Sequence, residues 1–373
     1  MCECINVEKK SIENLDIVIH SVGGIKKYFI TANHEKAGKE YKLLDNLMRF
    51  IESENAHVLS QLVFGSCKYY DEHIDTFNEL SDSFSWPVTW LHGDGCSCDC
   101  LTSTQVTAVS GVDVDHIVLD GVRVGSTYKD NYAEYCYLGN ITTDDVSASN
   151  DQQALAAYDK MVRALDSVNM KFTDVIRMWN YLDDLLDWYD EFNVMRTAFF
   201  NRHNVFGGIV PAGTGIGASN PSNAAYIGEL LAVKPLNNNP DVKLSAIPSP
   251  MQCPAIDYKS SFSRAIEIDL PSSRYLSISG TASIEPGGKT VFLDDTAGQI
   301  DLTMQVISAI LESRGMTWSD TAKAIAYFKD IKEQPLFTEY LKKNNYPHFP
   351  VAISHADICR DDLLFELELD AVK

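Results

Sequence analysis

The chain has 373 residues, enough for two domains of ordinary size, and 45% of them are hydrophobic, so sizeable cores can form. Its formal net charge of −21 opposes binding to nucleic acids and adhesion to anionic membranes, although a local arginine pocket can still bind a small anion. No run approaches the length of a transmembrane helix, and the polar first ten residues do not resemble a signal peptide. With an odd count of nine cysteines, this predicts a cytoplasmic protein with free thiols.

The N-terminal half begins with short segments that are rich in β-branched and aromatic residues. Such segments predict strands, here at residues 15–19, 27–31, 57–66, 86–92 and 114–119. Residues 39–54 instead have the apolar spacing of an amphipathic helix. The cysteine-containing segment 93–100 is predicted to be a loop.

The same order of elements occurs twice later in the chain. In the first copy, an amphipathic helix is predicted at 151–166, a short polar connection at 169–174 and a strand at 175–182. In the second copy, the same elements are predicted at 298–313, 314–320 and 321–328. Aligning Asp174 with Asp320 gives one offset of 146 residues, which also matches Leu165 with Leu311 and Tyr181 with Tyr327. We interpret this as a duplicated α+β unit. Chance similarity of two amphipathic helices is the alternative.

The boundary between the two copies is expected after a connecting helix at residues 188–205. This divides the chain into domains 1–205 and 206–373. Residues 206–223 are rich in Gly, Pro, Ser and Thr, and residues 237–254 contain four prolines, so both segments are predicted to be loops. The glycine spacing fits neither a phosphate loop nor a dinucleotide fingerprint, and a loop that closes over a small anion is the preferred interpretation.

The last segment, residues 365–372, alternates apolar and acidic side chains, as a half-buried strand does. Polar residues 360–362 predict a turn before it, and a tight hairpin there would place Cys359 directly opposite Glu366, with Cβ atoms about 5 Å apart. A thiol that faces a carboxyl group can form a catalytic pair. The alternative is that Cys359 only fills space and the acidic residues cover a solvated face of the sheet.

Cysteines at positions 96, 98 and 100, with those at 2 and 4, raise the question of a zinc site. Paired ligands of structural zinc sites are normally separated by two residues, whereas one residue separates these. The histidines form no HExxH motif, and no Gly-x-Ser-x-Gly nucleophile elbow is present. We therefore predict no metal site and interpret the cysteines as loop thiols.

Six short runs in the second half suggest a known family. They are RMWNY at 177–181, FNxxR at 192–196, PAxTGIG at 211–217, SFSRA at 261–265, SGTASI at 279–284 and ADICRxxLLxE at 356–366. The repeated unit resembles the RidA (YjgF) fold unit, and the chain more specifically resembles the chorismatase family. This resemblance implies an α+β fold of two fused RidA/YjgF-like (chorismate-mutase-like) units, each a mixed sheet packed by helices on one face. The C-terminal unit would carry the active site.

The resemblance also implies an activity, the cofactor-free cleavage of chorismate to pyruvate and a ring product. Glu366 occupies the position of the family's general acid, which protonates the enolpyruvyl group. Cys359 lies seven residues before it, as in the branch that makes 3-hydroxybenzoate, whereas the hydrolytic branch has Ala there. A carboxylic acid can act in this way only while it is neutral, and burial raises its pKa toward that condition.

Chorismate carries two carboxylates, so its binding requires cationic groups. Arg264 and Arg196 are the expected anchors, with backbone donors near Thr214 and Gly215, and Ala282 lines the expected substrate site. The chain departs from the family at residues 246–258, where the usual tyrosine- and proline-rich loop is replaced. It also has Ala352 where imine-hydrolysing members of the wider fold have Arg, which argues against that activity.

Three interpretations therefore remain open from the sequence. The first is a chorismatase that makes 3-hydroxybenzoate, and the second is a divergent chorismatase with a hydrolytic (dihydroxycyclohexadiene carboxylate) or 4-hydroxybenzoate product. The third is a non-catalytic RidA-like module that binds a small metabolite. A small-molecule substrate is expected as the partner, with no nucleic acid and no membrane, and the protein is expected to be a monomer or a homotrimer.

Overall fold

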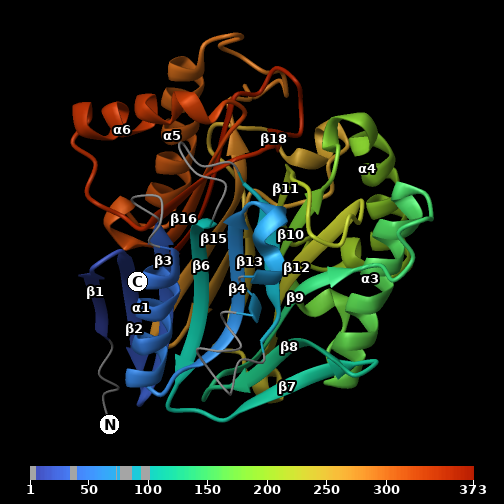
Figure 1. The fold of residues 1–373 in the computed structure, drawn as a ribbon, viewed down its shortest axis with the longest axis vertical. Helices are drawn as coiled ribbons and strands as arrows, with labels where there is room; N and C mark the ends of the chain where they lie inside the picture. The colour runs from blue at the N-terminus through green and yellow to red at the C-terminus, as the bar shows by residue number, and fades with distance from the viewer. Residues whose placement is uncertain (1–5, 34–39, 73, 76–85, 94–100) are drawn as a thin grey trace.

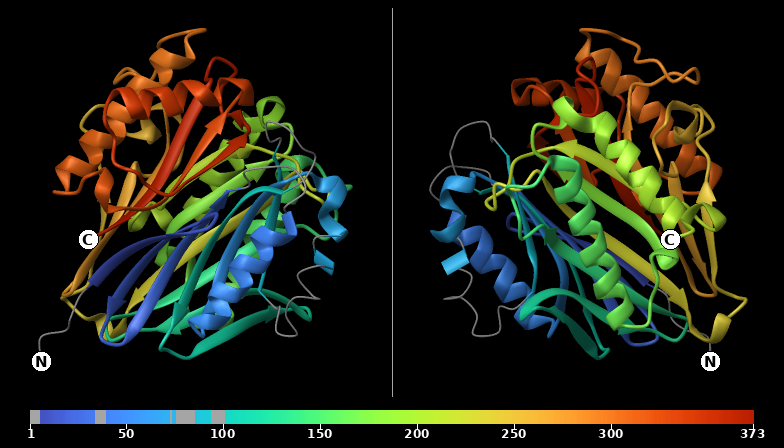
Figure 2. Two further views of the ribbon diagram at one scale, coloured as in Figure 1. Left: turned by 60° about the vertical axis from the view of Figure 1, so that its left-hand side comes forward. Right: turned by 90° about the vertical axis from the view of Figure 1, so that its right-hand side faces the viewer.

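The computed structural model describes residues 6–33, 40–72, 74–75, 86–93 and 101–373. Three mixed β-sheets surround a common centre, and helices cover their outer faces (Figures 1 and 2). The expected α+β class, with mixed sheets packed by helices on one face, is confirmed. The described chain contains three such sheets, whereas the duplication in the sequence indicated two units. Cysteines 2, 4, 96, 98 and 100 lie outside the described residues, and the described part of the chain contains no cluster of potential metal ligands.

Each sheet is built from one continuous part of the chain, apart from one short strand. The first sheet consists, in spatial order, of β1 (Asn6–Ile12), β2 (Leu15–Val22), β3 (Ile25–Asn33), β6 (Leu101–Ser110), β4 (His57–Gly65) and β5 (Val88–His92), with helix α1 (Glu40–Ser53). The second consists of β7 (Val114–Leu119), β8 (Val122–Lys129), β9 (Ala133–Thr142), β12 (Tyr226–Pro235), β10 (Val175–Leu182), β11 (Ala212–Gly217) and β18 (Asp357–Ile358), with helices α3 (Asn150–Ser167) and α4 (Leu185–Arg202). The third consists of β13 (Lys243–Ile247), β14 (Ala265–Leu270), β15 (Ser273–Ala282), β19 (Phe365–Val372), β16 (Thr321–Phe328) and β17 (Val351–His355), with helices α5 (Thr296–Ser313) and α6 (Gln334–Lys343).

The three sheets share one topology. In each, the fourth strand of the unit runs parallel to the fifth and antiparallel to the sixth, as β4, β10 and β16 show. Helices α3 and α5 and strands β10 and β16 begin 146 residues apart, so the repeat inferred from the sequence is confirmed. The first unit repeats the same pattern, but its helix α1 has 14 residues where α3 and α5 have 18.

Both faces of each sheet are buried at its central strands, but against different partners. Outer cores lie under the helices, one for each unit, with Trp90, Phe199 and Phe328 among their members. The inner faces meet at the centre of the molecule, where Tyr135 and Ile266 come from different sheets. This is why the strands contain near-continuous apolar runs and not the clean alternation of a half-solvated sheet.

The units contact one another in a cycle. Strand β11 of the second unit packs against β15 of the third, β17 of the third packs against β3 and β6 of the first, and β5 of the first packs against β9 of the second. The three interfaces are thus related by an approximate threefold rotation. Equivalent positions in the three interfaces can be compared directly, and they differ in the residues that carry chemistry.

The glycine-rich segment 206–223, predicted to be a loop, contains strand β11. Its glycines allow neighbouring groups to approach the backbone, since a Cβ at Gly217 would lie 2.6 Å from Cβ of Asp357. That close approach lets β18 pair with β11. Segment 237–254 likewise contains strand β13. The predicted division after residue 205 stays a prediction; in the structure it falls between α4 and β11, which belong to the second unit.

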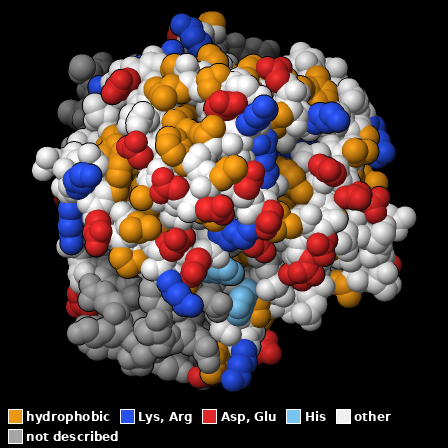
Figure 3. Space-filling view, turned by 90° about the horizontal axis from the view of Figure 1, so that it is seen from above, with side chains coloured by type: hydrophobic (Ala, Val, Ile, Leu, Met, Phe, Trp, Pro, Cys, Tyr) orange, Lys and Arg blue, Asp and Glu red, His pale blue; other side chains and the backbone are white. Residues whose placement is uncertain are grey.

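Charged side chains of both signs are interspersed on the face of the molecule seen from above (Figure 3). In the described part of the chain, no helix has the length and apolar character needed to cross a bilayer. The described cysteines at positions 67, 136, 253 and 359 are all free, as predicted.

Candidate active site

Glu366 lies at the interface between the second and third sheets. Strand β19, which carries it, is the central strand of its sheet, and Glu366 pairs with Ala282 on β15 and with Tyr327 on β16. Its carboxyl group lies directly over Gly280, because a Cβ at that position would collide with Oε1. Glu366 is only 4% exposed, so the alternative of a solvated acidic face is wrong.

The surroundings of Glu366 keep its carboxyl group neutral at physiological pH. Burial and the neighbouring charge of Glu368 raise its pKa to about 8, although Arg177 and Arg264 act in the opposite direction. A carboxyl group with this pKa retains its proton at pH 7. It can therefore act as a general acid.

Glu368, two residues along the same strand, is held by a network of hydrogen bonds. Arg177 Nη2 donates to Glu368 Oε2 at 2.7 Å and to Thr214 Oγ1 at 2.8 Å, and the Thr214 hydroxyl donates to Glu368. The backbone N–H of Gly280 donates to the Thr214 hydroxyl at 3.0 Å, and Trp179 Nε1 donates to Glu368 Oε1 at 2.9 Å. This network links the second sheet to the third and fixes a negative charge beside the acid.

Cys359 approaches the site differently from the prediction. No hairpin pairs Cys359 with Glu366, because the preceding strand β18 pairs with β11 of the second sheet and β19 pairs within the third. The thiol nevertheless lies close enough to Glu366 for their charges to interact. Burial and the charge of Glu366 together raise the pKa of Cys359 to about 12. A thiol with this pKa stays protonated and is a poor nucleophile.

The two arginines predicted to bind carboxylates are both buried and both unpaired with an acid in the described part of the chain. Arg264 Nε and Nη2 donate to the carbonyl of Cys253 at 3.1 and 2.8 Å. Arg196 Nη2 donates to Asn193 Oδ1 at 2.5 Å, and its Nε has no hydrogen-bond partner. The charge of Arg264 acts on Glu366 and that of Arg196 acts on Cys359, so both guanidinium groups lie near the candidate site.

The remaining predicted residues frame the same region. Thr214 and Gly215 lie on β11, and Tyr189 of α4 packs over Gly215, with its hydroxyl 3.4 Å from where a Cβ would lie. Arg264 lines a cavity of about 340 Å³ together with Phe262 and Pro254, while Glu366 is not among the residues that line it. Arg264 thus lines this cavity, and its charge also acts on the acid.

Four functional candidates were not singled out from the sequence, namely Arg177, Glu368, Tyr189 and Tyr258. Arg177 is 1% exposed, and its Nε and Nη1 have no hydrogen-bond partner. The guanidinium carbon of Arg264 lies over the ring of Tyr258, 5.3 Å from the ring centroid. Arg177 begins the run at 177–181, so the run itself was the available signal, but nothing in it showed that the arginine side chain reaches the last strand.

The interface between the first and second sheets repeats part of this network without its acid. Thr89, which pairs with Leu62 as Thr214 pairs with Trp179, donates to Glu229 Oε1 at 2.6 Å and accepts from the backbone N–H of Asn140 at 2.8 Å. The registers place Ile227 where the other interface has Glu366, and Ser60 where it has Arg177. Of these two interfaces, the one between the second and third sheets combines the hydrogen-bond network with an acid, Glu366, and a cation, Arg177. The other interface has neither at the equivalent positions.

Comparisons with known proteins show which family the chain resembles. A family model described as chorismatase FkbO/Hyg5-like, N-terminal, matches residues 120–227, which form most of the second unit. A protein named 3-hydroxybenzoate synthase from Streptomyces hygroscopicus is 25% identical over 277 residues, covering 66% of this chain and 76% of its own. The chain is thus similar in sequence to the chorismatases. A protein named chorismatase from Streptomyces rapamycinicus is 26% identical over 218 residues, which are 53% of this chain and 64% of that protein.

The similarity in fold covers nearly the whole chain. A crystal structure of a chorismatase superposes with a TM-score of 0.65 at 18% identity, covering 92% of this chain and 98% of its own. The first unit, which the sequence runs did not reach, therefore belongs to the shared fold. The resemblance inferred from the runs at 177–366 is confirmed.

Proposed function

We propose that this protein is a chorismatase that converts chorismate to 3-hydroxybenzoate and pyruvate without a cofactor. The observation that carries the proposal is the arrangement around Glu366, a buried carboxyl group with a pKa raised to about 8 near two buried arginines that have no acidic partner in the described chain. A dianionic substrate would supply the missing acids, and an enol ether needs the proton.

The proposed reaction begins with proton transfer from Glu366 to the methylene carbon of the enolpyruvyl group. The resulting cation is centred on the carbon that carries the ether oxygen. The substrate's own C4 hydroxyl then attacks C3, the bond from C3 to the ether oxygen breaks, and pyruvate leaves as a ketone. The hydroxyl proton returns to Glu366, and the epoxide that remains opens and aromatises to 3-hydroxybenzoate. The atoms of chorismate are thus divided between two products, with no water consumed.

Arg264 and Arg196 would each bind one carboxylate of the substrate. Their guanidinium groups are positioned by Cys253 and Asn193, so few rotatable bonds need to be ordered when the substrate binds. Binding of two further negative charges near Glu366 would raise its pKa above the value of the free enzyme, which favours the acid form when it is needed.

Cys359 would determine which product forms. Its protonated thiol occupies space beside the acid, where the hydrolytic branch is expected to have the smaller Ala. A bulkier side chain would exclude the water that hydrolysis requires and leave the C4 hydroxyl as the nearest nucleophile. The relative named 3-hydroxybenzoate synthase supports this branch.

The test is to incubate the purified protein with chorismate, follow pyruvate by a coupled reduction to lactate, and separate the ring products by chromatography. We expect stoichiometric pyruvate and 3-hydroxybenzoate. A dihydroxycyclohexadiene carboxylate or 4-hydroxybenzoate in its place would overturn the product assignment and retain a chorismatase. Absence of pyruvate, with chorismate bound, would overturn the enzymatic proposal in favour of a metabolite-binding module.

A further inference from the structure

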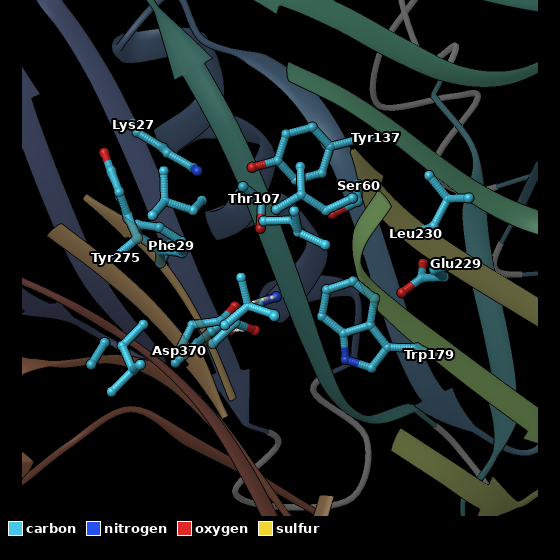
Figure 4. A pocket seen from close by; sticks show the side chains of 18 of the residues that line it. Lys27, Phe29, Ser60, Thr107, Tyr137, Trp179, Glu229, Leu230, Tyr275 and Asp370 are labelled. Carbon is cyan, nitrogen blue, oxygen red and sulfur yellow. Dashed lines mark hydrogen bonds and ion pairs between the residues drawn. The ribbon is translucent and has the colours of Figure 1, made fainter. Parts of the chain in front are cut away.

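Lys27 is a buried cation that lies between the sheets. The proposed reaction does not use it. Its ammonium group lies among aromatic rings, 4.7 Å from the ring centroid of Tyr275, 5.2 Å from that of Phe29 and 5.5 Å from that of Tyr137 (Figure 4). It is only 6% exposed. No hydrogen bond or ion pair to this ammonium occurs in the described part of the chain.

The two carboxylates whose charges act on Lys27 form their hydrogen bonds and ion pairs with other groups. Asp370 accepts from Ser277 at 2.6 Å and lies 3.6 Å from the ammonium of Lys323. Asp130 accepts from two backbone N–H groups at 2.7 Å and from the hydroxyl of Tyr135 at 2.8 Å. Both affect the charge of Lys27 from a distance, and neither forms an ion pair with it.

Lys27 and Tyr275 line two adjoining small cavities, one between the sheets and one beside the turns at residues 22–25, 130–132 and 270–273. We use the name Lys27 chamber for the cavity that is also lined by His20, Asp130, Ser272 and Ser273. All three units contribute to it, since His20 and Lys27 come from the first, Asp130 from the second and the two serines from the third. Its volume is about 30 Å³, which is room for roughly two or three water-sized groups.

Hydrogen-bond donors without acceptors gather in this chamber. His20 Nε2 and Ser272 Oγ are buried and have no hydrogen-bond partner, and the only side chain that the Ser273 hydroxyl interacts with in the described chain is that of Tyr275. His20 Nδ1 lies 2.5 Å from the hydroxyl of Tyr275. Burial, with the charge of Lys27, lowers the pKa of His20 to about 4, so its ring is neutral at pH 7. If Tyr275 donates to Nδ1, then Nε2 carries the ring proton and is a donor without an acceptor.

We propose that the Lys27 chamber binds a small monovalent anion, of the size of chloride or formate. Such an ion would neutralise the ammonium and accept hydrogen bonds from the histidine and the serine hydroxyls. Larger carboxylates exceed the volume of the chamber. Because the chamber is formed by all three units, the bound ion would hold them together and stabilise the fold without taking part in catalysis.

The proposal is tested by thermal unfolding of the full chain at constant ionic strength, with gluconate replaced stepwise by chloride, formate or benzoate. We expect a saturable rise in Tm of a few degrees with chloride and formate and none with benzoate. Crystals soaked in bromide should show an anomalous peak within hydrogen-bond distance of Lys27 Nζ. Coincident melting curves in chloride and gluconate, with waters alone in the chamber, would overturn the proposal.

Two variants and a matched control separate binding from folding. Lys27→Met keeps the length of the side chain and removes its charge, and it should abolish both the Tm response and the bromide peak. If that variant fails to fold, the double variant Ser272→Ala with Ser273→Ala keeps the lysine and should weaken the anion response about tenfold. Lys26→Met removes the adjacent, exposed lysine, which pairs with Glu54 and lines neither cavity, and this variant should respond to chloride as the wild type does. An unchanged response in Lys27→Met would contradict the assignment.

Discussion

The chemistry proposed here depends on one carboxyl group that the fold keeps protonated. Glu366 is buried between two sheets, and the first cause of its raised pKa is the loss of solvation of its charged form. The nearby arginines oppose this effect and are too few to reverse it, in part because Arg177 is already paired with Glu368 at 2.7 Å.

Glu366→Gln is expected to reduce pyruvate release by at least about 10³-fold, because a carboxamide has the shape of the acid and no acidic proton. Circular dichroism and Tm should be unchanged or Tm slightly raised, because the variant carries no charge that burial disfavours. Initial rates with saturating chorismate measure the effect. Turnover near that of the wild type would exclude Glu366 as the acid.

The pH dependence follows from the sign of the same pKa shift. The acid form of Glu366 is present below its folded pKa of about 8 and is lost as the pH rises through that value. We therefore expect kcat/KM to be steady near pH 7 and to fall tenfold per pH unit above about 8. An unshifted glutamate would instead lose its proton near pH 4.5. A profile that falls between pH 4 and 6 would contradict the proposed role.

Cys359→Ala is expected to change the products more than the rate. The smaller side chain leaves space for water beside the cation, so part of the flux should shift from 3-hydroxybenzoate to the hydrolytic product. Total pyruvate release should stay within about tenfold of the wild type, since the protonated thiol with its pKa of about 12 donates no proton at pH 7. Chromatography of the ring products measures the ratio, and an unchanged ratio would remove the steering role.

At the scale of the element, strand β19 carries two acids on one face, and they differ in function. Glu368 accepts hydrogen bonds from Arg177, Thr214 and Trp179, whereas no such bond to Glu366 is found in the described chain. The strand thus places a carboxylate that is paired with Arg177 beside a carboxyl group whose pKa is raised to about 8. Neighbouring carboxyl groups in such different environments are typical of acid catalysis.

Glu368→Gln is expected to lower the pKa of Glu366 by roughly one unit, because it removes a neighbouring negative charge and releases Arg177 to act on Glu366. The alkaline limb of the kcat/KM profile should move to lower pH by the same amount. Glu229→Gln is the matched control, since Glu229 occupies the equivalent position in the second unit and accepts from Thr89 in the same way. Equal shifts in both variants would contradict a local effect.

At the scale of the whole molecule, three copies of one topology form three interfaces in a single chain. Thr214 and Thr89 make equivalent hydrogen bonds across two of them, each donating to a glutamate and accepting from a backbone N–H. The two threonines are therefore expected to contribute similarly to stability. Of the two threonines, only Thr214 lies near Glu366.

Thr214→Val and Thr89→Val provide a direct comparison of these interfaces. Each removes a buried hydroxyl and leaves its partners unpaired, so each should lower the free energy of unfolding by about 1–3 kcal/mol, measured by chemical denaturation. Only Thr214→Val should also lower turnover, by about tenfold or more, because it disturbs Glu368 and Arg177 beside the acid. Equal losses of turnover would show that the site is not confined to the interface of the second and third sheets.

Much of the fold was predictable because the spacing of apolar residues along the chain indicates its helices and strands. The strands at 15–19, 57–66 and 175–182 and the repeat at an offset of 146 residues are all confirmed. The first unit was missed as a third copy because its helix is shorter and its sequence does not align at that offset. Strand β11 was missed because glycine is a poor strand residue by propensity, and its role here is to allow close packing.

By itself the sequence determined the class of fold, the duplicated unit, the resemblance to chorismatases and the choice of Glu366, because each depends on residues that are near in the chain or in a recognisable run. Only the tertiary structure decided that both faces of β19 are buried, that Arg177 and Thr214 bond to Glu368, and that Cys359 approaches from β18 of another sheet. The physical reason is distance along the chain. These groups come from segments up to 191 residues apart, and the environment that sets a pKa is made by neighbours in space, which a local pattern cannot report.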